Sequence, residues 1–510
     1  MAGNNRTKYS LYNAISAIGL TLVNGLLGII VTRQIISRFG SDFNGLNSTV
    51  NQIINVLLIL EGGFALASNV ALFAPISSGD YATANGIMKA TRNKFRSIGI
   101  IFLLAGTVIA IAYSFAVNTG LSREFVFTVI MMAVVPQAVN LYFSTTYRVL
   151  LQTQQKEYVI SAFTALTIGA GHIANIIMIR HGGQMWMVRF ITMAFALLNS
   201  LLIVGYTRRT NSFIDLSQGA KPELIKGTGD VMAQKITGVI YTSWPIVFLS
   251  ISRNGGTMLA SVYAVYNSVF VMIKALLHAA IDAPRLGFGQ MLTERSREEV
   301  WPVYKQYEFL AIIFTFIAMT TGAALIMPFI RLYTSGIDDI NYYDLTIAIL
   351  MILIGMVEMI HIPSGHLINM SGNFRISKYF QIIACAVLIV SMSVLGMLYG
   401  VYGMLVSLLV VAILLAVMEI GFIHTRFFEH KVLEFAGILV PFAIAGVAVS
   451  CFEMKFINDV SGYPMLLVYA IIVLLVNALI CLAVCYISNR KLTRGIIERA
   501  AALAKSFIKQ

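Results

Sequence analysis

The chain has 510 residues, of which 58% are hydrophobic and only 12% are charged. Soluble domains carry about 25% charged residues, so this composition excludes an ordinary soluble protein and predicts a protein of the lipid bilayer. The formal net charge is +13. Lys and Arg accumulate in the cytoplasmic loops of membrane proteins, so this charge is explained by topology and no nucleic-acid partner is expected. The four cysteines lie in apolar stretches and predict neither a disulfide framework nor a metal site.

A transmembrane helix needs about 20 predominantly apolar residues, and the sequence contains fourteen such runs. We therefore predict an all-α, polytopic membrane protein. The first run is longer than a signal-peptide core and is followed directly by Arg33, so we interpret it as a permanent span. The predicted spans are, in chain order, 11–32, 46–73, 98–118, 125–150, 158–179, 186–206, 236–252, 257–282, 308–330, 344–369, 376–398, 401–423, 435–452 and 465–487.

Most of the 36 Lys and Arg residues fall on one side of the membrane when successive connections are assigned to alternate sides. A minority, including Arg33 and Arg189, fall on the other side. The side rich in Lys and Arg is the cytoplasmic one, so both termini are predicted to be cytoplasmic. This arrangement requires an even number of spans.

The longest connection, 207–235, divides the predicted spans into groups of six and eight. A weak similarity between the two halves aligns Asn51 with Asn267 and favours parallel repeats related by an axis along the membrane normal. We predict an N-terminal six-helix lobe at 1–206, an inter-lobe connection at 207–235, a C-terminal six-helix lobe at 236–430, and two additional helices with a basic cytoplasmic tail at 431–510.

The stretch 44–75 is long and mostly apolar, so it is expected to cross the membrane as one helix, yet it carries several polar residues. Amides recur on it at three- and four-residue spacing, which places them on one helical face: they belong to Asn44, Asn47, Asn51 and Asn55. Lipid offers no hydrogen-bond partners, so this face should line protein or a water-filled cavity. We take the last three as candidate cargo-binding residues. Glu61 is either a proton or cation site or a partner in a hydrogen bond between helices.

A second polar face lies on the span 125–150 and consists of Gln137, Asn140, Ser144 and Arg148. Arg148 is either a cavity residue or an anchor at the cytoplasmic interface, and Arg33 has the same two interpretations at the opposite side. A guanidinium donates two parallel hydrogen bonds, which suits a diphosphate. Arg33, Gln137 and Arg148 are therefore candidate cargo-binding residues.

The span 257–282 has a third polar face, formed by Tyr263, Asn267, Lys274 and His278. A cation within the hydrocarbon costs about 2.5–3.5 kcal/mol on insertion scales and usually faces a cavity or a partner. The alternative is a lysine whose side chain reaches the cytoplasmic interface. We predict that all four residues line a cavity.

The span 344–369 contains Glu358 and His361, three residues apart, with Pro363 and His366 following. A histidine beside a carboxylate titrates near physiological pH. Glu358 and His361 are therefore either an ion-coupling site or a satisfied polar pair at a helix kink. A proton or sodium gradient is the candidate energy source, and no other cofactor is expected.

Motifs of the main hydrolytic enzymes are missing from the sequence. It has no Walker-type phosphate loop, no HExxH pair and no GxSxG elbow. The remaining histidines, His172, His181, His424 and His430, are scattered along the chain. We predict a protein that is not an enzyme.

Five segments carry a resemblance to a known family: 38–80, 148–160, 262–292, 327–345 and 362–378. In their order and spacing, from about residue 8 to 430, the chain resembles the polysaccharide and O-antigen flippase branch of the multidrug/oligosaccharidyl-lipid/polysaccharide exporter superfamily. This resemblance implies two lobes that open alternately around a cationic cavity in a bacterial cytoplasmic membrane. The implied cargo is polyprenyl-diphosphate-linked oligosaccharide, moved to the outer leaflet, and its negative charge accounts for Arg33, Arg148 and Lys274. Membrane lipids, a polysaccharide polymerase and chain-length machinery are the implied partners.

Three alternatives remain open at this point. A cation-coupled multidrug exporter of the same superfamily should have an acidic, aromatic cavity, for which Glu61, Glu358 and Tyr263 are the available residues. A flippase for the peptidoglycan precursor is a related branch. A membrane enzyme that polymerises or ligates sugars should carry a large outer loop, whereas the outer loops here are short.

Overall fold

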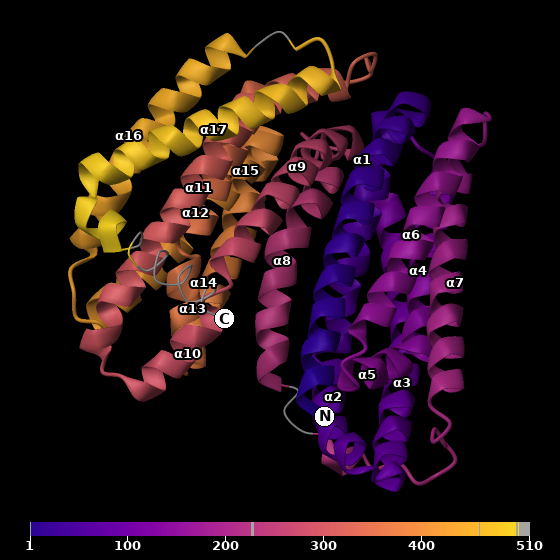
Figure 1. The fold of residues 1–510 in the computed structure, drawn as a ribbon. Coiled ribbons are helices and arrows are strands. Elements are labelled where there is room, and N and C mark those ends of the chain that lie inside the picture. The colour runs from indigo at the N-terminus through magenta and orange to yellow at the C-terminus, as the bar shows by residue number, and fades with distance from the viewer. Residues whose placement is uncertain (1, 226–228, 458–459, 496–497, 499–510) are drawn as a thin grey trace. The chain divides into compact units, whose positions relative to one another are not determined.

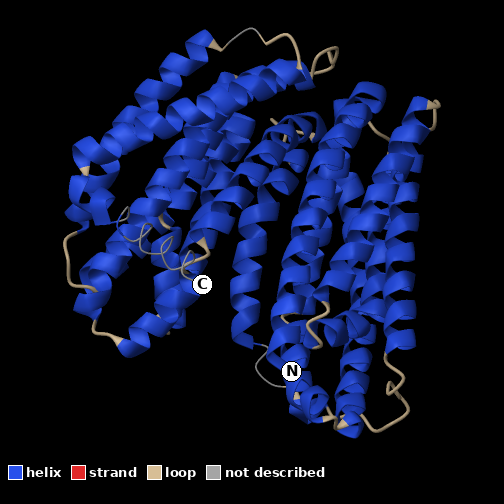
Figure 2. Cartoon of the chain, viewed as in Figure 1, coloured by secondary structure: helices blue, strands red, loops and turns tan. Residues whose placement is uncertain are grey.

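The computed structural model describes residues 2–225, 229–457, 460–495 and 498. These residues form helices and loops and no strand (Figure 2), which confirms the all-α prediction. The chain divides into two compact units, Met1–Ser261 and Val262–Gln510, and each is described by itself below.

Eleven helical segments among the described residues are long and apolar enough to cross a membrane, and 64–78 and 236–251 are shorter apolar helices. Two of the eleven, 15–61 and 374–427, are 47 and 54 residues long, about twice the length that a bilayer requires. The protein is therefore a multi-pass membrane protein. The count of fourteen spans and the cytoplasmic position of both termini remain predictions.

Both very long segments are interrupted by a glycine. Gly40 has φ 85° and Gly400 has φ 59°, values that a residue without Cβ adopts at little cost. Each glycine lies between two predicted spans, where the sequence analysis placed a short connection.

The helices of unit 1 pack around α1, the indigo helix of Figure 1, which contacts α6 and α8. Phe43, Phe95 and Phe102 are fully buried in the hydrophobic core of this unit. The elements are α1 (Ala2–Leu57), η1 (Leu58–Glu61), α2 (Phe64–Ser78), α3 (Tyr81–Ala116), α4 (Arg123–Val139), η2 (Asn140–Ser144), α5 (Thr145–Thr153), α6 (Glu157–Arg180), α7 (Met185–Thr210), η3 (Pro222–Leu224) and α8 (Gly229–Ile251).

The stretch 44–75 is not one helix, contrary to the prediction. The regular helix ends at Leu57, a short 3-10 turn follows, and α2 begins at Phe64. Gly62 and Gly63 have φ 56° and 74°, a left-handed conformation that ends helices and that glycine adopts without strain. Glu61 therefore lies at a break between helices.

The first part of the predicted inter-lobe connection 207–235 lies against the start of α3. The side-chain amide of Asn85 donates to the carbonyl of Phe213 (2.8 Å), and the ring of Phe213 stacks on Tyr81 at 4.4 Å. The backbone N–H of Lys221 donates to the carbonyl of Gly86 (3.0 Å). Residues 226–228 of this connection lie outside the described part of the chain.

Unit 2 contains the remaining helices, including the two that follow the predicted second lobe. Helices α16 and α17 pack on α11 around Phe309, Phe316, Phe442 and Cys481. The elements are α9 (Thr257–Ile281, whose first turn belongs to unit 1), α10 (Arg285–Glu294), α11 (Arg297–Tyr333), α12 (Leu345–Ile360), α13 (Ile362–Met370), α14 (Phe374–Ser391), η4 (Met392–Gly396), α15 (Met397–Phe422), η5 (Ile423–Phe427), α16 (Val432–Phe456) and α17 (Tyr463–Ser488).

The compact units differ from the predicted lobes in one element. Helix α8 belongs to unit 1 by its contacts with α1, whereas the sequence analysis assigned 236–252 to the second lobe. The lobe boundaries remain a prediction about which helices move together. Most of the predicted basic tail lies outside the described residues.

Candidate functional site

Unit 1 contains two adjoining polar cavities. The first, about 300 Å³, lies among α4, η2, α5, α6 and α7; the second, about 310 Å³, lies among α1, α4 and α7. We call them the first and second cavities. They share Pro136, Gln137, Thr192 and Ala196, so the wall between them consists of α4 and α7. The polar residues of the first cavity are Gln137, Asn140, Arg148, Thr164, Thr167, His172, Asn175, Thr192, Asn199 and Ser200, and those of the second are Asn51, Asn55, Gln137, Arg189 and Thr192.

An interruption of α4 lies next to the first cavity. Pro136 lies inside α4, where its ring removes a backbone hydrogen bond, and the chain continues as the π-helix η2 before α5 begins at Thr145. π-Bulges of this kind occur frequently at functional sites. Arg148 follows one turn later and lines the first cavity.

Arg148 is positioned by an amide rather than by a carboxylate. Its Nη2 donates to Oδ1 of Asn199 on α7 (3.1 Å). The amide nitrogen of Asn199 donates in turn to the hydroxyls of Thr164 (3.1 Å) and Thr167 (3.0 Å) on α6. These two bonds orient Oδ1 toward the arginine. The partner of the guanidinium is therefore a neutral group, which does not offset its positive charge.

The second cavity has a similar arrangement around Arg189, which is only 5% exposed. Its Nη1 donates to Oδ1 of Asn51 (3.0 Å), and its Nη2 donates to the backbone carbonyl of Asn47. The sequence analysis counted Arg189 only as a cation of an outer connection. The structure instead buries it on α7 against the amide face of α1.

Several predicted site residues of unit 1 thus come together and others do not. Asn51, Asn55 and Gln137 line one cavity, and Gln137 lines the other with Arg148. Asn47 contributes its carbonyl to Arg189, while Arg33 is half-buried on α1. Neither Arg33 nor Glu61 lines these two cavities.

The sequence analysis assigned none of the polar cavity residues of α6 and α7 to a site; besides four hydroxyl residues they are His172, Asn175, Arg189 and Asn199. The sequence did contain a pattern that could have identified two of them. Asn175 and Asn199 are isolated amides within apolar runs, as Gln137 is in α4. Only the packing of α4, α6 and α7 shows that the three helices direct these amides to one place.

In unit 2, Lys274 is paired. Its Nζ lies 3.0 Å from Oε2 of Glu358 on α12, and the two side chains are 25% and 14% exposed. On the same helix, Tyr263 is buried and Asn267 is half-buried. His278 is exposed and lies 3.4 Å from Asp282. The predicted polar face therefore extends from the interior to the surface of unit 2.

His361 lies where α12 ends and α13 begins, and its carboxylate partner is on another helix. Nδ1 of His361 lies 2.8 Å from Oε2 of Glu419 on α15. A Cβ on Gly365 would lie 2.8 Å from the same carboxylate oxygen, so a glycine at this position leaves room for Glu419. The sequence carried a signal here too, because Glu419 is the only carboxylate in the span 401–423.

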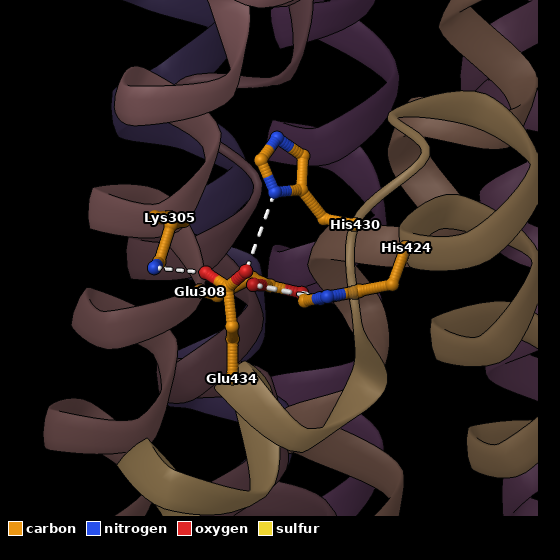
Figure 3. A network of polar contacts seen from close by, with 5 residues as sticks. All are labelled: Lys305, Glu308, His424, His430 and Glu434. Atoms are coloured by element: carbon orange, nitrogen blue, oxygen red, sulfur yellow. Dashed lines mark hydrogen bonds and ion pairs between the residues drawn. The ribbon is translucent and has the colours of Figure 1, made fainter.

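Two histidines that are scattered in the sequence join a polar network in unit 2 (Figure 3). Nε2 of His424 lies 3.0 Å from Oε1 of Glu308, and both side chains are buried. Glu434 accepts from Nζ of Lys305 (2.6 Å) and lies 3.3 Å from Nδ1 of His430. This network joins α11 to η5 and to the start of α16.

Unit 2 also contains an apolar cavity of about 360 Å³ between α11, α12 and α16. Its wall includes Phe316, Met356, Phe442 and Val447. No charged residue is among the described residues of its lining. The cavity can therefore accept a hydrocarbon chain but offers little to a polar ligand.

Comparison with known proteins gives a clear result for the fold. No protein-family model and no curated protein matches the sequence. The Lipid II flippase MurJ in an inward closed conformation superposes with a TM-score of 0.66 over 94% of this chain and 99% of its own, at 11% identity. An inward-facing multidrug resistance MATE family transporter of the MOP superfamily gives 0.63 over 84% and 95%, at 13% identity. The chain therefore shares its fold with these two proteins.

A third solved structure, the MATE multidrug transporter DinF-BH in complex with R6G, gives a TM-score of 0.58 at 13% identity, over 83% of this chain and 97% of its own. The same fold thus occurs in multidrug transporters and in a lipid flippase. At these identities the cargo has to be argued from the residues of this chain.

Proposed function

We propose that this protein is a flippase that moves polyprenyl-diphosphate-linked oligosaccharide from the cytoplasmic to the outer leaflet of a bacterial cytoplasmic membrane. Transport proceeds by alternating access of two lobes. The cargo then supplies the surface polysaccharide pathway, with its polymerase and chain-length machinery as partners.

The observation that carries this proposal is the donor set of the two unit 1 cavities. Their described lining combines amides and hydroxyls with Arg148 and Arg189 and includes no carboxylate. Amides and hydroxyls form hydrogen bonds with sugar hydroxyls, and guanidinium groups suit phosphate oxygens. A cationic drug would find no charge partner in such a lining.

The apolar cavity of unit 2 supports a lipid-linked cargo. Phe316 and Phe442 are among the large side chains that line it, and a lining without charged groups is compatible with the hydrocarbon tail of such a cargo. Taken separately, the cavities of unit 1 suit the polar part of a lipid-linked cargo and the cavity of unit 2 suits its apolar part.

The cation-coupled multidrug exporter remains the second candidate, and unit 2 is what favours it. Glu358, His361 and Glu419 are partly buried ionisable groups, and such groups within membrane spans often mark ion pathways. In the flippase proposal the same groups are candidates for coupling to a proton or sodium gradient.

The test is deletion of the gene followed by analysis of the lipid fraction. Accumulation of polyprenyl-diphosphate-linked oligosaccharide together with loss of surface polysaccharide is the expected result. An unchanged lipid pool, with increased sensitivity to cationic dyes, would instead establish the drug exporter.

Complementation with variants connects this phenotype to the cavities. Gln137→Ala removes a polar group that lines both cavities and should restore less surface polymer than the unaltered gene. Asn93→Ala, at an exposed amide of α3, is the matched control and should complement fully. If the two variants restore surface polymer equally, the polar lining that Gln137 provides is not required for transport.

A further inference from the structure

A buried ionisable pair joins η5 to α11 in unit 2, and the proposed function makes no use of it (Figure 3). Nε2 of His424 lies 3.0 and 3.2 Å from the two carboxylate oxygens of Glu308. The two side chains are only 0% and 1% exposed, so water does not screen them. A carboxylate at such a depth requires a compensating positive charge.

The negative charge of Glu308 is balanced when the pair holds one further proton, as an imidazolium beside a carboxylate. No Lys or Arg among the described residues forms an ion pair with Glu308. Lys305, on the same helix, is already paired with Glu434 (2.6 Å). A neutral His424 would still donate a hydrogen bond from Nε2, but it would leave an uncompensated negative charge in the interior.

The surroundings of His424 favour its charged form. The rings of Trp301 and Phe435 have their centroids 5.0 and 5.9 Å from that of His424, and a cation within about 6 Å of an aromatic ring is attracted to it. Because Nε2 is used by Glu308, Nδ1 is the atom that gains or loses the proton. Nδ1 is buried and forms no hydrogen bond with the protein, so no other donor occupies this position.

The other titratable groups on the elements packed against His424 have partners of their own or are exposed. Arg426, Glu429 and Lys431 are exposed. The partnered groups are Tyr304 with Ser364, Arg297 with the carbonyl of Phe427, Lys305 and His430 with Glu434, Glu419 with His361, and His366 with Tyr307. The buried pair is therefore the site at which a proton changes the charge balance.

The pair lies at an irregular junction of the chain. His424 belongs to the π-helix η5, a type of helix that is frequent at functional sites. Glu429, which follows, has φ 59°, a value that residues with a side chain seldom adopt. Helix α16 then begins at Val432 and forms one wall of the apolar cavity. Attachment of this junction to α11 therefore helps to position that wall.

We propose that His424 and Glu308 form a proton-binding site whose occupancy fastens η5 and the start of α16 to α11. With the proton bound, the buried pair is neutral and the junction is held. Without it, an unbalanced carboxylate remains and the attachment weakens. The attached state thus binds the proton more tightly than the released state, so its stability decreases as the pH rises. The inference goes beyond the proposed function, because it concerns unit 2 alone and does not depend on the cargo.

The test is amide hydrogen exchange, measured by mass spectrometry on the full-length protein in phosphatidylcholine nanodiscs between pH 5 and 8. After correction for the intrinsic pH dependence of exchange, protection of residues 423–435 should fall as the pH rises. The expected fall is at most about tenfold per pH unit, the limit for a single proton. Peptides of unit 1 should keep their protection, which excludes global unfolding. A flat profile for residues 423–435 in the unaltered protein overturns the proposal.

Variants assign the effect to the pair. The double variant Glu308→Gln/His424→Gln keeps two groups that can form a hydrogen bond but carries no charge, so its protection should not depend on pH. His424→Gln alone leaves the carboxylate unbalanced and should reduce protection at pH 5. His430→Gln is the matched control, because it removes the neighbouring exposed histidine and keeps the buried pair; it should retain the pH dependence. A double variant that follows pH as the unaltered protein does overturns the proposal.

A second measurement needs no variant and replaces the double variant if that protein fails to fold. Deuterium uptake at C2 of each histidine ring, followed by mass spectrometry on the unaltered protein, reports the charge state of each ring. His424 should change its charge state over the pH range in which residues 423–435 lose protection. If His424 keeps one charge state throughout this range, the proposal is overturned.

Discussion

The ammonium of Lys274 and the carboxylate of Glu358 lie 3.0 Å apart, joining α9 to α12 within unit 2. In this conformation the carboxylate already neutralises the lysine. The cation that the sequence offers most directly to a diphosphate therefore has to leave an ion pair before it can bind cargo.

Because Lys274 is paired with Glu358, single and double variants of the pair can separate the contribution of Lys274 to stability from its contribution to transport. Removing one partner of a buried ion pair costs about 3–5 kcal/mol, but these side chains are 25% and 14% exposed, so we expect about 1–3 kcal/mol for Lys274→Gln or Glu358→Gln alone. The double variant should regain part of this loss, because neither charge is left unpaired. Thermal unfolding of the purified variants measures the difference.

Transport by the same three variants then tests cargo binding. We predict that Lys274→Gln reduces transport in a protein that still folds. A double variant that is stable but inactive would assign the lysine to the cargo, whereas full activity of the double variant would make the pair purely structural.

The His361–Glu419 pair is the stronger candidate for ion coupling. It lies at the break between α12 and α13, with side chains 14% and 8% exposed. Glu419→Gln keeps a hydrogen-bond acceptor but cannot carry a negative charge, so transport should persist at a reduced rate and lose its dependence on the proton or sodium gradient. Transport into vesicles with imposed gradients measures this dependence.

Glu434→Gln provides the control for this prediction, because Glu434 belongs to the separate pair with Lys305. It should leave the gradient dependence unchanged. If transport by Glu419→Gln follows the imposed gradient as closely as the unaltered protein does, His361 and Glu419 hold the helix break together and do not couple ions.

Close packing within unit 1 predicts a strong effect at one glycine. A Cβ on Gly45 would lie 1.6 Å from the backbone carbonyl oxygen of Thr257, so Gly45→Ala has to displace α1 from this segment. Overpacking of this kind costs about 1–3 kcal/mol or more, and we expect a lower unfolding temperature and lower expression.

Gly28→Ala is the matched substitution on the same helix, because no atom lies within 4 Å of its added Cβ. It should be neutral or slightly stabilising, since alanine is the better helix former. Equal unfolding temperatures for the two variants would contradict the close approach at Gly45.

The N-terminal cap of α3 predicts a local dependence on pH. The carboxylate of Asp80 accepts a hydrogen bond from the backbone N–H of Thr83 (3.0 Å), and this bond lowers the pKa of Asp80 below its ordinary value of 3.8. A lowered pKa stabilises the folded form fully above the unfolded-state pKa, and this stabilisation is lost as the pH falls through the folded-state pKa. Below about pH 4, the first turn of α3 should therefore lose protection against hydrogen exchange, once the measured rates are corrected for the intrinsic slowing of amide exchange in acid.

Asp80→Asn should remove this dependence while keeping a capping side chain. The first turn of α7 is an internal reference, because it contains no acidic residue and has no side-chain cap. An equal loss of protection in both helices would assign the effect to global unfolding.

Much of the architecture was predictable from the sequence alone. Apolar runs interrupted by short polar connections specify membrane-spanning helices, because a backbone in lipid must satisfy its own hydrogen bonds. Isolated polar residues within those runs identified Asn51, Gln137, Arg148 and His361 as unusual, because lipid gives such groups no partners. These are local properties that a sequence displays directly.

Only the tertiary structure decided which of these groups meet. Asn51 accepts a hydrogen bond from Arg189, which lies on a helix more than a hundred residues later in the chain. His361 pairs with Glu419 on α15 and not with Glu358, its neighbour in the sequence. The break at Gly62 and Gly63 likewise divides a stretch whose composition favoured one helix. Which polar groups meet depends on how the helices pack and how each is rotated about its axis. An apolar pattern specifies that helices form, but several packings and rotations are compatible with the same pattern.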